Sequence, residues 1–424
     1  MTDTDIPVTA LTAPGPEQTH QAAGYPASEL AGYPATADGW LDRARQVAKI
    51  LAVDAAARER EGRAPHREVQ LLKDSGLVTL MGPTAHGGAG ETWPTALRAC
   101  REVSKADASV GQLLGYHYLW AWATRFFGTE EQASREEARY TQNCLFYSGA
   151  INPRDKNLTA ADEGATLRLN GSKSFASGSL VSDLTCLTAA LEDGRPVFVI
   201  VDSASVSYNH DWDNMGQRQT ESGSVTVTDL VIPWTEAIGY VEKKITPLVY
   251  NSLSLLTLQL IMTNMYLGIA EGAMESAAEY TRTKTRAWPY GGDNKESATD
   301  EWYILEAYGD FRSKLWAAEA LIDQVNSELA DLLHARRETV TFPQRGEVAV
   351  RISAAKQRII RDGLDVCSRI FEVMGARSTA AEYGFDRFWR NLRTHSLHDP
   401  VAYKAREVGR YELLGEPPQP SFYT

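Results

Sequence analysis

The chain has 424 residues and a formal net charge of −12. This length usually divides into two or three structural units, and the acidic balance argues against a protein that tracks nucleic acid, which needs a basic surface. The four cysteines have no CxxC or Cys/His metal spacing, so we expect no metal site and reduced core residues at Cys100, Cys144, Cys186 and Cys367.

The N-terminus has no basic stretch followed by an apolar one, so we expect no standard signal peptide and a cytoplasmic protein. The most apolar segment runs from Ser252 to Ala270 and contains Thr257, Gln259, Thr263 and Asn264. Polar residues at this density fit a helix buried in protein better than a helix that faces lipid. We therefore expect no membrane span.

Residues 1–38 are rich in Ala, Pro, Thr and Gly, and repeat AGYPA at residues 23–27 and 31–35. This composition buries too little apolar surface to fold alone, so a flexible N-terminal arm is expected. A helical domain follows over residues 39–144. Apolar residues recur with helical spacing in four stretches: Trp40–Glu61, Val69–Ser75, Trp93–Ala106 and Ser109–Phe127.

From residue 145 to residue 238 the apolar pattern changes to a period of two, which predicts a β domain, either a small barrel or a sandwich. Its strands are expected at Ala165–Leu169, Leu184–Ala190, Pro196–Val201 and Gly223–Ile232. Residues 239–400 return to long helical stretches, which predict a C-terminal bundle. These helices are expected at Ser252–Arg286, Asp300–Ala335 and Gly346–Met374, and residues 401–424 are expected to form a tail.

The segment from Phe371 to Pro400 combines glycine, arginine, aromatic and histidine residues. Arg387, Arg390 and Arg393 recur every three residues, so one side of a helix would present guanidinium groups suited to a phosphate or carboxylate. His395 and His398 follow, and imidazoles beside a bound anion suit proton transfer. The pattern predicts a local anion site with acid–base chemistry beside it.

Four motifs give the chain a specific resemblance. They are GYH at residues 115–117, LNGSK at 169–173, MGQRQT at 215–220 and EYGFDRFWRNLRTHSLHDPVAYK at 382–404. With the order helix, sheet, helix bundle, they resemble the acyl-CoA dehydrogenase superfamily, and within it the reduced-flavin-dependent (group D) monooxygenases related to dibenzothiophene monooxygenase. The resemblance spans residues 40–424.

The resemblance implies an α+β, acyl-CoA dehydrogenase-like fold: an N-terminal helical domain, a central β-barrel or sandwich and a C-terminal four-helix bundle. It implies a homotetramer with flavin sites at subunit interfaces, and a separate NAD(P)H:flavin reductase. Reduced FMN, with FAD as the alternative, would react with O2 to a C4a-hydroperoxyflavin that oxygenates an organosulfur substrate such as a thiophene, sulfide, sulfone or sulfinate. The same flavin chemistry on an indole carbon or an amine nitrogen is the nearest alternative.

A second alternative is an FAD-dependent acyl-CoA dehydrogenase. In those enzymes the corresponding segment leads into Tyr-Glu-Gly-Thr, whose glutamate abstracts the substrate proton, whereas this chain has His398-Asp399-Pro400-Val401. Asp399 is one methylene shorter than glutamate, and proton abstraction depends steeply on placement. The resemblance therefore favours a monooxygenase with His398 as its acid–base group.

The resemblance also assigns roles to individual residues. Catalytic roles fall on His398, Tyr116 and Ser177. Cofactor contacts fall on Ser148, Ser177, Trp212, Arg218, Arg286, Gly375, Arg377, Arg393 and His398. The substrate pocket would include Gln112, Tyr116 and Ala150, and dibenzothiophene monooxygenases have a histidine and an asparagine at the positions of Gln112 and Ala150.

Each assignment has an ordinary structural alternative. Tyr116 lies in an aromatic stretch that would also suit a protein core, and Ser177-Gly178 would suit a plain turn. Arg286 follows a long helix, where a cation interacts favourably with the helix dipole without any ligand. Arg377 is the stronger phosphate candidate, because the preceding glycine lets backbone and guanidinium approach an anion together.

Overall fold

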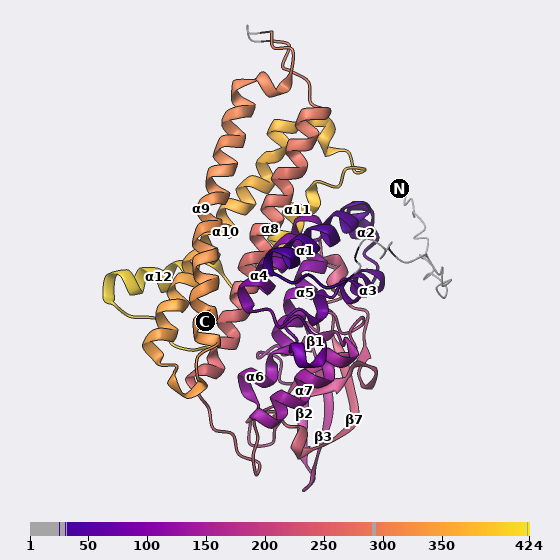
Figure 1. The fold of residues 1–424 in the computed structure, drawn as a ribbon, viewed down its shortest axis with the longest axis vertical. Helices are drawn as coiled ribbons and strands as arrows, with labels where there is room; N and C mark the ends of the chain where they lie inside the picture. Colours follow the sequence, from indigo (N-terminus) through magenta and orange to yellow (C-terminus); the bar gives the residue numbers. More distant parts are fainter. Residues whose placement is uncertain (1–24, 26–29, 31, 291–293, 422) are drawn as a thin grey trace, which may run out of the picture.

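The computed structural model describes residues 25, 30, 32–290, 294–421 and 423–424 (Figure 1). Most of the expected N-terminal arm lies outside the described residues. Two described residues of that arm dock onto the helical domain: the Tyr25 hydroxyl donates to Glu68 Oε1 at 2.8 Å, and the Leu30 side chain is buried.

The N-terminal domain is helical, as the sequence predicts, but two of the expected helices are interrupted. Trp40–Glu61 breaks at Val53–Asp54, and Ser109–Phe127 breaks at Trp122. A polar helix that the apolar pattern did not indicate follows, and Thr129 and Gln132 form a capping box at its start. The helices are α1 (Ala37–Ala52), α2 (Ala55–Glu61), α3 (His66–Asp74), α4 (Trp93–Ala106), α5 (Ala108–Ala121), α6 (Ala123–Phe127) and α7 (Glu130–Asn143).

The β domain is one mixed sheet that curves into a half-barrel. Its order is β1-β4-β2-β3-β7-β6, and β5 also pairs with β4. Alternation failed to predict β1, β2 and β6 because each has only two to four residues. The strands are β1 (Tyr147–Ala150), β2 (Thr159–Asp162), β3 (Thr166–Lys173), β4 (Leu184–Leu191), β5 (Pro196–Asp202), β6 (Ser207–Tyr208) and β7 (Val225–Pro233).

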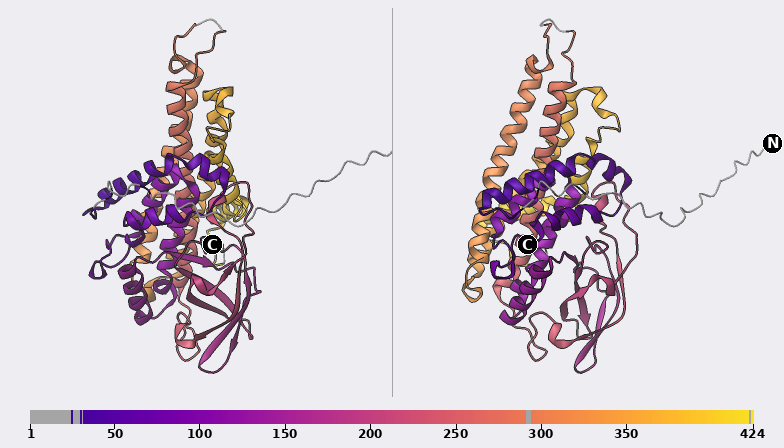
Figure 2. Two further views of the ribbon diagram at one scale, coloured as in Figure 1. Left: turned by 90° about the vertical axis from the view of Figure 1, so that its right-hand side faces the viewer. Right: turned by 45° about the vertical axis from the view of Figure 1, so that its right-hand side comes forward.

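Long helices form the C-terminal part, and α10 packs against α8, α9 and α12. Figure 2 shows the sheet at the lower end of the molecule and the joined tips of α8 and α9 projecting from the opposite end. The region expected to be a tail contains α12, which begins directly after Pro400, and Pro400 has the extended backbone of a helix N-cap. The helices are α8 (Leu253–Thr283), α9 (Trp302–Leu333), α10 (Phe342–Met374), α11 (Asp386–His395) and α12 (Val401–Leu414).

Helix α8 is the centre of the molecule. Its Gly268 and Gly272 face α4 so closely that a Cβ atom would lie 2.3 Å from the Arg101 carbonyl oxygen and 2.0 Å from that of Lys105, respectively. Among the described residues, only the stretch Val249–Thr283 is long and apolar enough to cross a membrane, and 89% of its most apolar window is buried in protein. The expected buried helix is therefore confirmed.

The described cysteines are all free thiols. Cys100, Cys186 and Cys367 are buried, and Cys144 is half-buried. Burial raises the pKa of the Cys100 thiol to about 12, so it stays protonated and unreactive at neutral pH.

Candidate active site

The site begins where helix α5 meets the turn that follows β3. The Gln112 side chain is 3% exposed, and its Nε2 lies 3.5 Å from Ser177 Oγ, which is itself 2.7 Å from Ser222 Oγ. Gln112 Oε1 is buried and has no hydrogen-bond partner among the described residues. A buried acceptor without a donor is costly in a folded protein, so this atom indicates a place for a ligand's hydrogen-bond donor.

Strand β1 adds Ser148 and Ala150 to this region. Ser148 is buried, and its Oγ lies 2.9 Å from Thr185 Oγ1 and 2.8 Å from Ser182 Oγ, within a cluster of hydroxyl groups. Ala150 is fully buried with the apolar side chains of the sheet. The roles expected for Ser148 in flavin binding and for Ala150 in the substrate pocket stay predictions.

Tyr116 lies one helical turn after Gln112, and its hydroxyl is 3.2 Å from His395 Nε2. The Tyr266 hydroxyl donates to the His395 carbonyl at 3.1 Å and lies 2.8 Å from His395 Nδ1. A hydroxyl has one proton to donate, so His395 carries its proton on Nδ1 and accepts from Tyr116 through Nε2. Burial, together with the nearby His398 and Lys356, lowers the pKa of His395 well below its usual value, so this ring is neutral.

The involvement of Tyr266 could not be predicted from the sequence. It lies in the long apolar stretch of α8, where an aromatic residue is ordinary core, and no local pattern connects it to a histidine 129 residues away.

His398 follows α11 and is 32% exposed, so one side of its ring faces outward. The ring is nearly parallel to that of His395, with centroids 6.1 Å apart and 16° between the planes. Its Nδ1 lies 3.3 Å from Asp399 Oδ1, and Asp399 also pairs with the buried Lys356. Burial alone would raise the pKa of Asp399, but His398 and Lys356 hold it well below its usual value.

The loop from Trp212 to Thr220 is fastened to α11. The Gln217 backbone N–H donates to Asn391 Oδ1 at 2.7 Å, and Arg390 Nη1 donates to the Met215 carbonyl at 2.6 Å. Trp212 Nε1 closes the loop internally by donating to the Gln217 carbonyl at 2.8 Å. The half-buried Trp212 and the exposed Phe175, with ring centroids 6.4 Å apart, give this edge of the β domain an aromatic surface.

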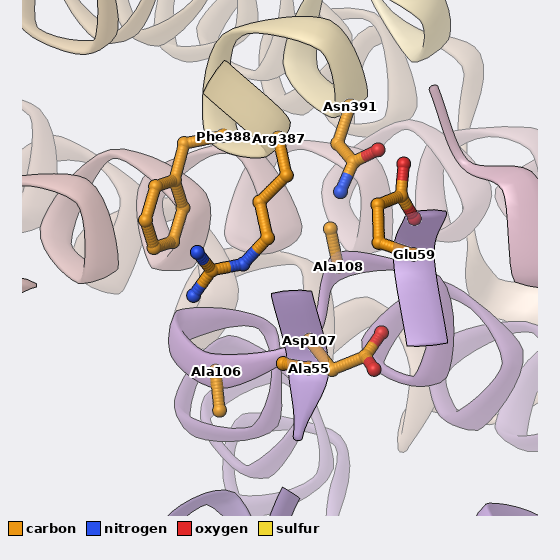
Figure 3. A pocket seen from close by; sticks show the side chains of 8 residues that line it. All are labelled: Ala55, Glu59, Ala106, Asp107, Ala108, Arg387, Phe388 and Asn391. Atoms are coloured by element: carbon orange, nitrogen blue, oxygen red, sulfur yellow. The ribbon is translucent and has the colours of Figure 1, made fainter. Parts of the chain in front are cut away.

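The expected anion site on α11 is wrong for Arg390. Its guanidinium pairs with Glu59 at 3.0 Å and with Asp386 at 2.8 Å, so it fastens α11 to α2. Arg387 lies over the ring of Phe388, 4.1 Å from its centroid. Figure 3 shows Arg387 with Glu59, Asp107 and Asn391 around a small recess between α2, α5 and α11.

Arg218 and Arg393 belong to this half of the molecule and are both half-buried. Arg218 lies against Gly62, where a Cβ atom would be 3.1 Å from its Nη2, and its Nη1 donates to the Asn214 carbonyl at 3.4 Å. Arg393 lies on α11 two residues before His395. Their expected contacts with a cofactor stay predictions.

Arg286, Gly375 and Arg377 form a separate group at the far end of the long helices. All three are exposed, and Arg377 Nη2 donates at 3.1 Å to the carbonyl of Lys284, directly after α8. Gly375 has φ of 81°, a conformation that glycine adopts without strain. From Tyr266 to Thr283, α8 rises for 17 residues at about 1.5 Å each, which separates this arginine group from the His395 region by about 25 Å.

Comparison with known proteins identifies the family. The N-terminal domain family of acyl-CoA dehydrogenases matches residues 38–137, and their C-terminal domain family matches residues 260–402. Dibenzothiophene monooxygenase from Rhodococcus erythropolis is 36% identical over 396 residues, which cover 89% of this chain and 94% of that protein. The chain belongs to the acyl-CoA dehydrogenase family.

Among solved structures, this acyl-CoA dehydrogenase family member is similar to monooxygenases. Methanesulfinate monooxygenase MsuC from Pseudomonas fluorescens is 36% identical and superposes with a TM-score of 0.87, over 91% of this chain and 99% of that one. FMN-bound TdsC from Paenibacillus sp. A11-2 is 38% identical with a TM-score of 0.85, over 91% of this chain and all of that one. The expected fold and family are confirmed.

The residues present fit a flavin mononucleotide like the one bound in TdsC. Gln112 and Ser177 offer neutral hydrogen-bonding groups, and the orphaned Gln112 Oε1 calls for a donor such as a ring N–H. Arg286 and Arg377 offer exposed guanidinium groups of the kind that bind phosphate in a bidentate manner. The two groups suit the two ends of the cofactor, although one chain holds them about 25 Å apart.

Proposed function

We propose that the protein is a flavin-dependent monooxygenase that oxygenates the sulfur atom of a small organosulfur compound. Organosulfur substrate, dioxygen and reduced FMN give the oxygenated sulfur compound, water and oxidised FMN. Reduced FMN supplies the two electrons and the activation of dioxygen. The observation that carries the proposal is the 36% identity with dibenzothiophene monooxygenase over nearly the whole chain.

The chain's own residues bind, orient and transfer protons. Ser177 holds the flavin ring through a hydrogen bond, and Gln112, whose Nε2 lies 3.5 Å from Ser177 Oγ, lines the substrate pocket beside it. Tyr116, held by the neutral His395, presents a hydroxyl to the substrate side. His398 Nε2, on the side of the ring away from Asp399, takes up a proton and passes it to the oxygen atom that leaves as water, while Nδ1 keeps its own proton toward Asp399.

The position of Asp399 argues against the acyl-CoA dehydrogenase alternative. Its carboxylate is 4% exposed and engaged by Lys356 and His398. A carboxylate with a strongly lowered pKa is also a weak proton acceptor. Asp399 therefore lacks both the access and the basicity that proton abstraction from a substrate would need.

The site needs a second copy of the chain. Arg286 and Arg377 lie about 25 Å along α8 from the His395 region, farther than one flavin mononucleotide reaches. A neighbouring copy brings its arginine group to the first copy's ring-binding group, and the symmetry of a homotetramer repeats this arrangement at every site. A separate NAD(P)H:flavin reductase in the cytoplasm supplies reduced FMN to these sites.

The decisive experiment is single-turnover oxidation with photoreduced FMN and ¹⁸O-labelled dioxygen. The panel contains dibenzothiophene, methanesulfinate, a dialkyl sulfone and indole, with products read by mass spectrometry. We expect one labelled oxygen atom in a sulfur product. Release of hydrogen peroxide alone with every compound would refute the proposal. A labelled indole product would show that the protein oxygenates carbon instead of sulfur.

Mixing variants tests whether the site is shared. His398→Ala removes a group from one half of the site, and Arg377→Ala removes a group from the other half. After subunit exchange, a shared site restores turnover at about a quarter of the sites, because one of the two mixed pairings joins intact halves. A site built within one chain would give no recovery.

A further inference from the structure

A buried ion pair lies directly behind His398. Lys356 on α10 is 1% exposed and Asp399 is 4% exposed, and the two side chains pair with each other. Lys356 Nζ also donates to Gln259 Oε1 and lies 3.7 Å from Met262 Sδ. Asp399 Oδ1 faces His398 Nδ1 at 3.3 Å, so one carboxylate connects the lysine to the histidine.

Both groups of the pair are charged at neutral pH. Burial lowers the pKa of Lys356 to about 8, with the attraction of Asp399 opposing it. The pKa of Asp399 lies well below its usual range, and Lys404 Nζ stands 3.8 Å from its second oxygen. A buried ion pair is weak as a stabilising device, because apolar residues of similar volume often serve the fold as well. Stability alone therefore does not account for this pair.

The surroundings leave His398 few orientations. His395 stacks on one side of the ring but uses both of its own nitrogens on Tyr116 and Tyr266, so it does not compete for Asp399. The ring of Tyr423 meets His398 edge-on, with centroids 6.0 Å apart. The Tyr423 carbonyl accepts from Lys404 Nζ at 2.6 Å, which fixes this residue against the same network.

We propose that Asp399, held in place and kept ionised by Lys356, is a positioning residue for His398. The carboxylate keeps the imidazole proton on Nδ1 and directs Nε2 toward the substrate side. Asp399 touches neither substrate nor cofactor, and acts through His398 alone. The effect on turnover rests on the proposed function, whereas the effect on the imidazole itself does not.

The test compares three variants in the full-length protein. In Asp399→Asn the amide presents both a donor and an acceptor to His398. We expect ¹⁵N NMR of labelled histidine to change from a single Nδ1–H tautomer of His398 to a mixture. The sulfur product formed per reduced FMN should fall at least about tenfold, with hydrogen peroxide in its place, because a positioned acid or base contributes about a hundredfold or more.

The double variant Lys356→Met with Asp399→Leu separates positioning from stability. It replaces the buried pair by apolar residues of similar size, so we expect a melting temperature near that of the wild type and unchanged FMN binding. The mixture of His398 tautomers should persist, and so should the loss of coupling, meaning the lower yield of sulfur product per reduced FMN. A double variant that keeps a single His398 tautomer and full coupling would overturn the proposal.

Asp365→Asn is the matched control. Asp365 is a carboxylate on α10, the helix that carries Lys356, and pairs with Lys314 at 2.7 Å, but its side chain is 39% exposed. This variant should change neither the His398 tautomer nor the sulfur product formed per reduced FMN. If the wild type oxygenates no sulfur compound, the proposed function fails, and the tautomer measurement alone still decides whether Asp399 positions His398.

Discussion

Two buried side chains near the site, Gln112 and His395, differ in how far the fold satisfies their hydrogen-bonding groups. Gln112 Oε1 has no donor within the described part of the chain, although Gln112 is almost completely buried. His395 shows the opposite condition, because both of its ring nitrogens are satisfied by tyrosine hydroxyls. Gln112 therefore has an acceptor left over for the ligand we expect there, whereas His395 is held in place by its neighbours.

The two tyrosines around His395 should respond differently to loss of the hydroxyl. Tyr266→Phe removes two contacts of His395, at 2.8 and 3.1 Å, and should lower the free energy of unfolding by about 2 kcal/mol or more. Tyr116→Phe removes one contact, at 3.2 Å, and should cost about 1 kcal/mol while reducing turnover more strongly. Urea unfolding and kcat measured on both variants test this order. Equal effects on both quantities would contradict it.

Glu59 should make stability depend on pH. Burial raises its pKa from 4.5 to about 7, with Arg390 opposing. Between these pH values the folded protein binds more protons than the unfolded chain, so its stability falls as the pH rises. Relative to Glu59→Gln, the wild type should lose about 3 kcal/mol of unfolding free energy from pH 4.5 to pH 7. Parallel pH profiles of the two proteins would rule this out.

At the scale of elements, close backbone approach decides how the helices pack. Gly268 and Gly272, four residues apart on α8, let the backbone of α4 come within contact of α8. Gly216 does the same for the 212–220 loop, because a Cβ atom there would lie 2.3 Å from the Arg390 carbonyl oxygen on α11. In each case the neighbour is backbone and cannot move aside as a flexible side chain would.

Gly272→Ala should therefore destabilise the protein by about 1 to 3 kcal/mol, because the new methyl group overlaps the Lys105 carbonyl. Gly409→Ala on α12 is the control, since nothing lies within 4 Å of its Cβ position. It should stabilise the protein by about 0.5 to 1 kcal/mol through helix propensity alone. Thermal and denaturant unfolding measure the stability of both variants. If Gly272→Ala left the free energy of unfolding unchanged, α4 and α8 would be able to move apart at little cost.

At the scale of the whole molecule, α9 exposes three large apolar side chains in the single chain. Trp302, Leu305 and Trp316 are 57% to 66% exposed and lie on one side of the helix by their spacing. We expect these apolar groups to be covered when copies of the chain associate. A second copy of the chain is the occupant we expect here, in line with the proposed division of the flavin site between two copies.

Trp316→Glu should weaken this association. Light scattering after gel filtration should give the wild type a mass near four times 46.7 kDa and the variant a smaller mass. FMN affinity should fall in parallel, because in the proposed shared site the arginine group comes from the neighbouring copy. Glu328→Gln, on the same helix but in a surface ion pair with Arg351, should change neither quantity. A Trp316→Glu protein of unchanged mass and affinity would place the interface elsewhere.

The sequence by itself determined the family, the helix–sheet–helix order and the long C-terminal helices, because these follow from local motifs and from apolar periodicity over many residues. It also pointed to Tyr116, Ser177 and His398. Only the tertiary structure decided which groups meet: Tyr116 contacts His395, 279 residues away, and Lys356 pairs with Asp399. In the tertiary structure Arg390 forms an internal ion pair with Glu59, and Arg377 lies far from the His395 region. Contacts between distant segments depend on packing, which no local pattern in the sequence records.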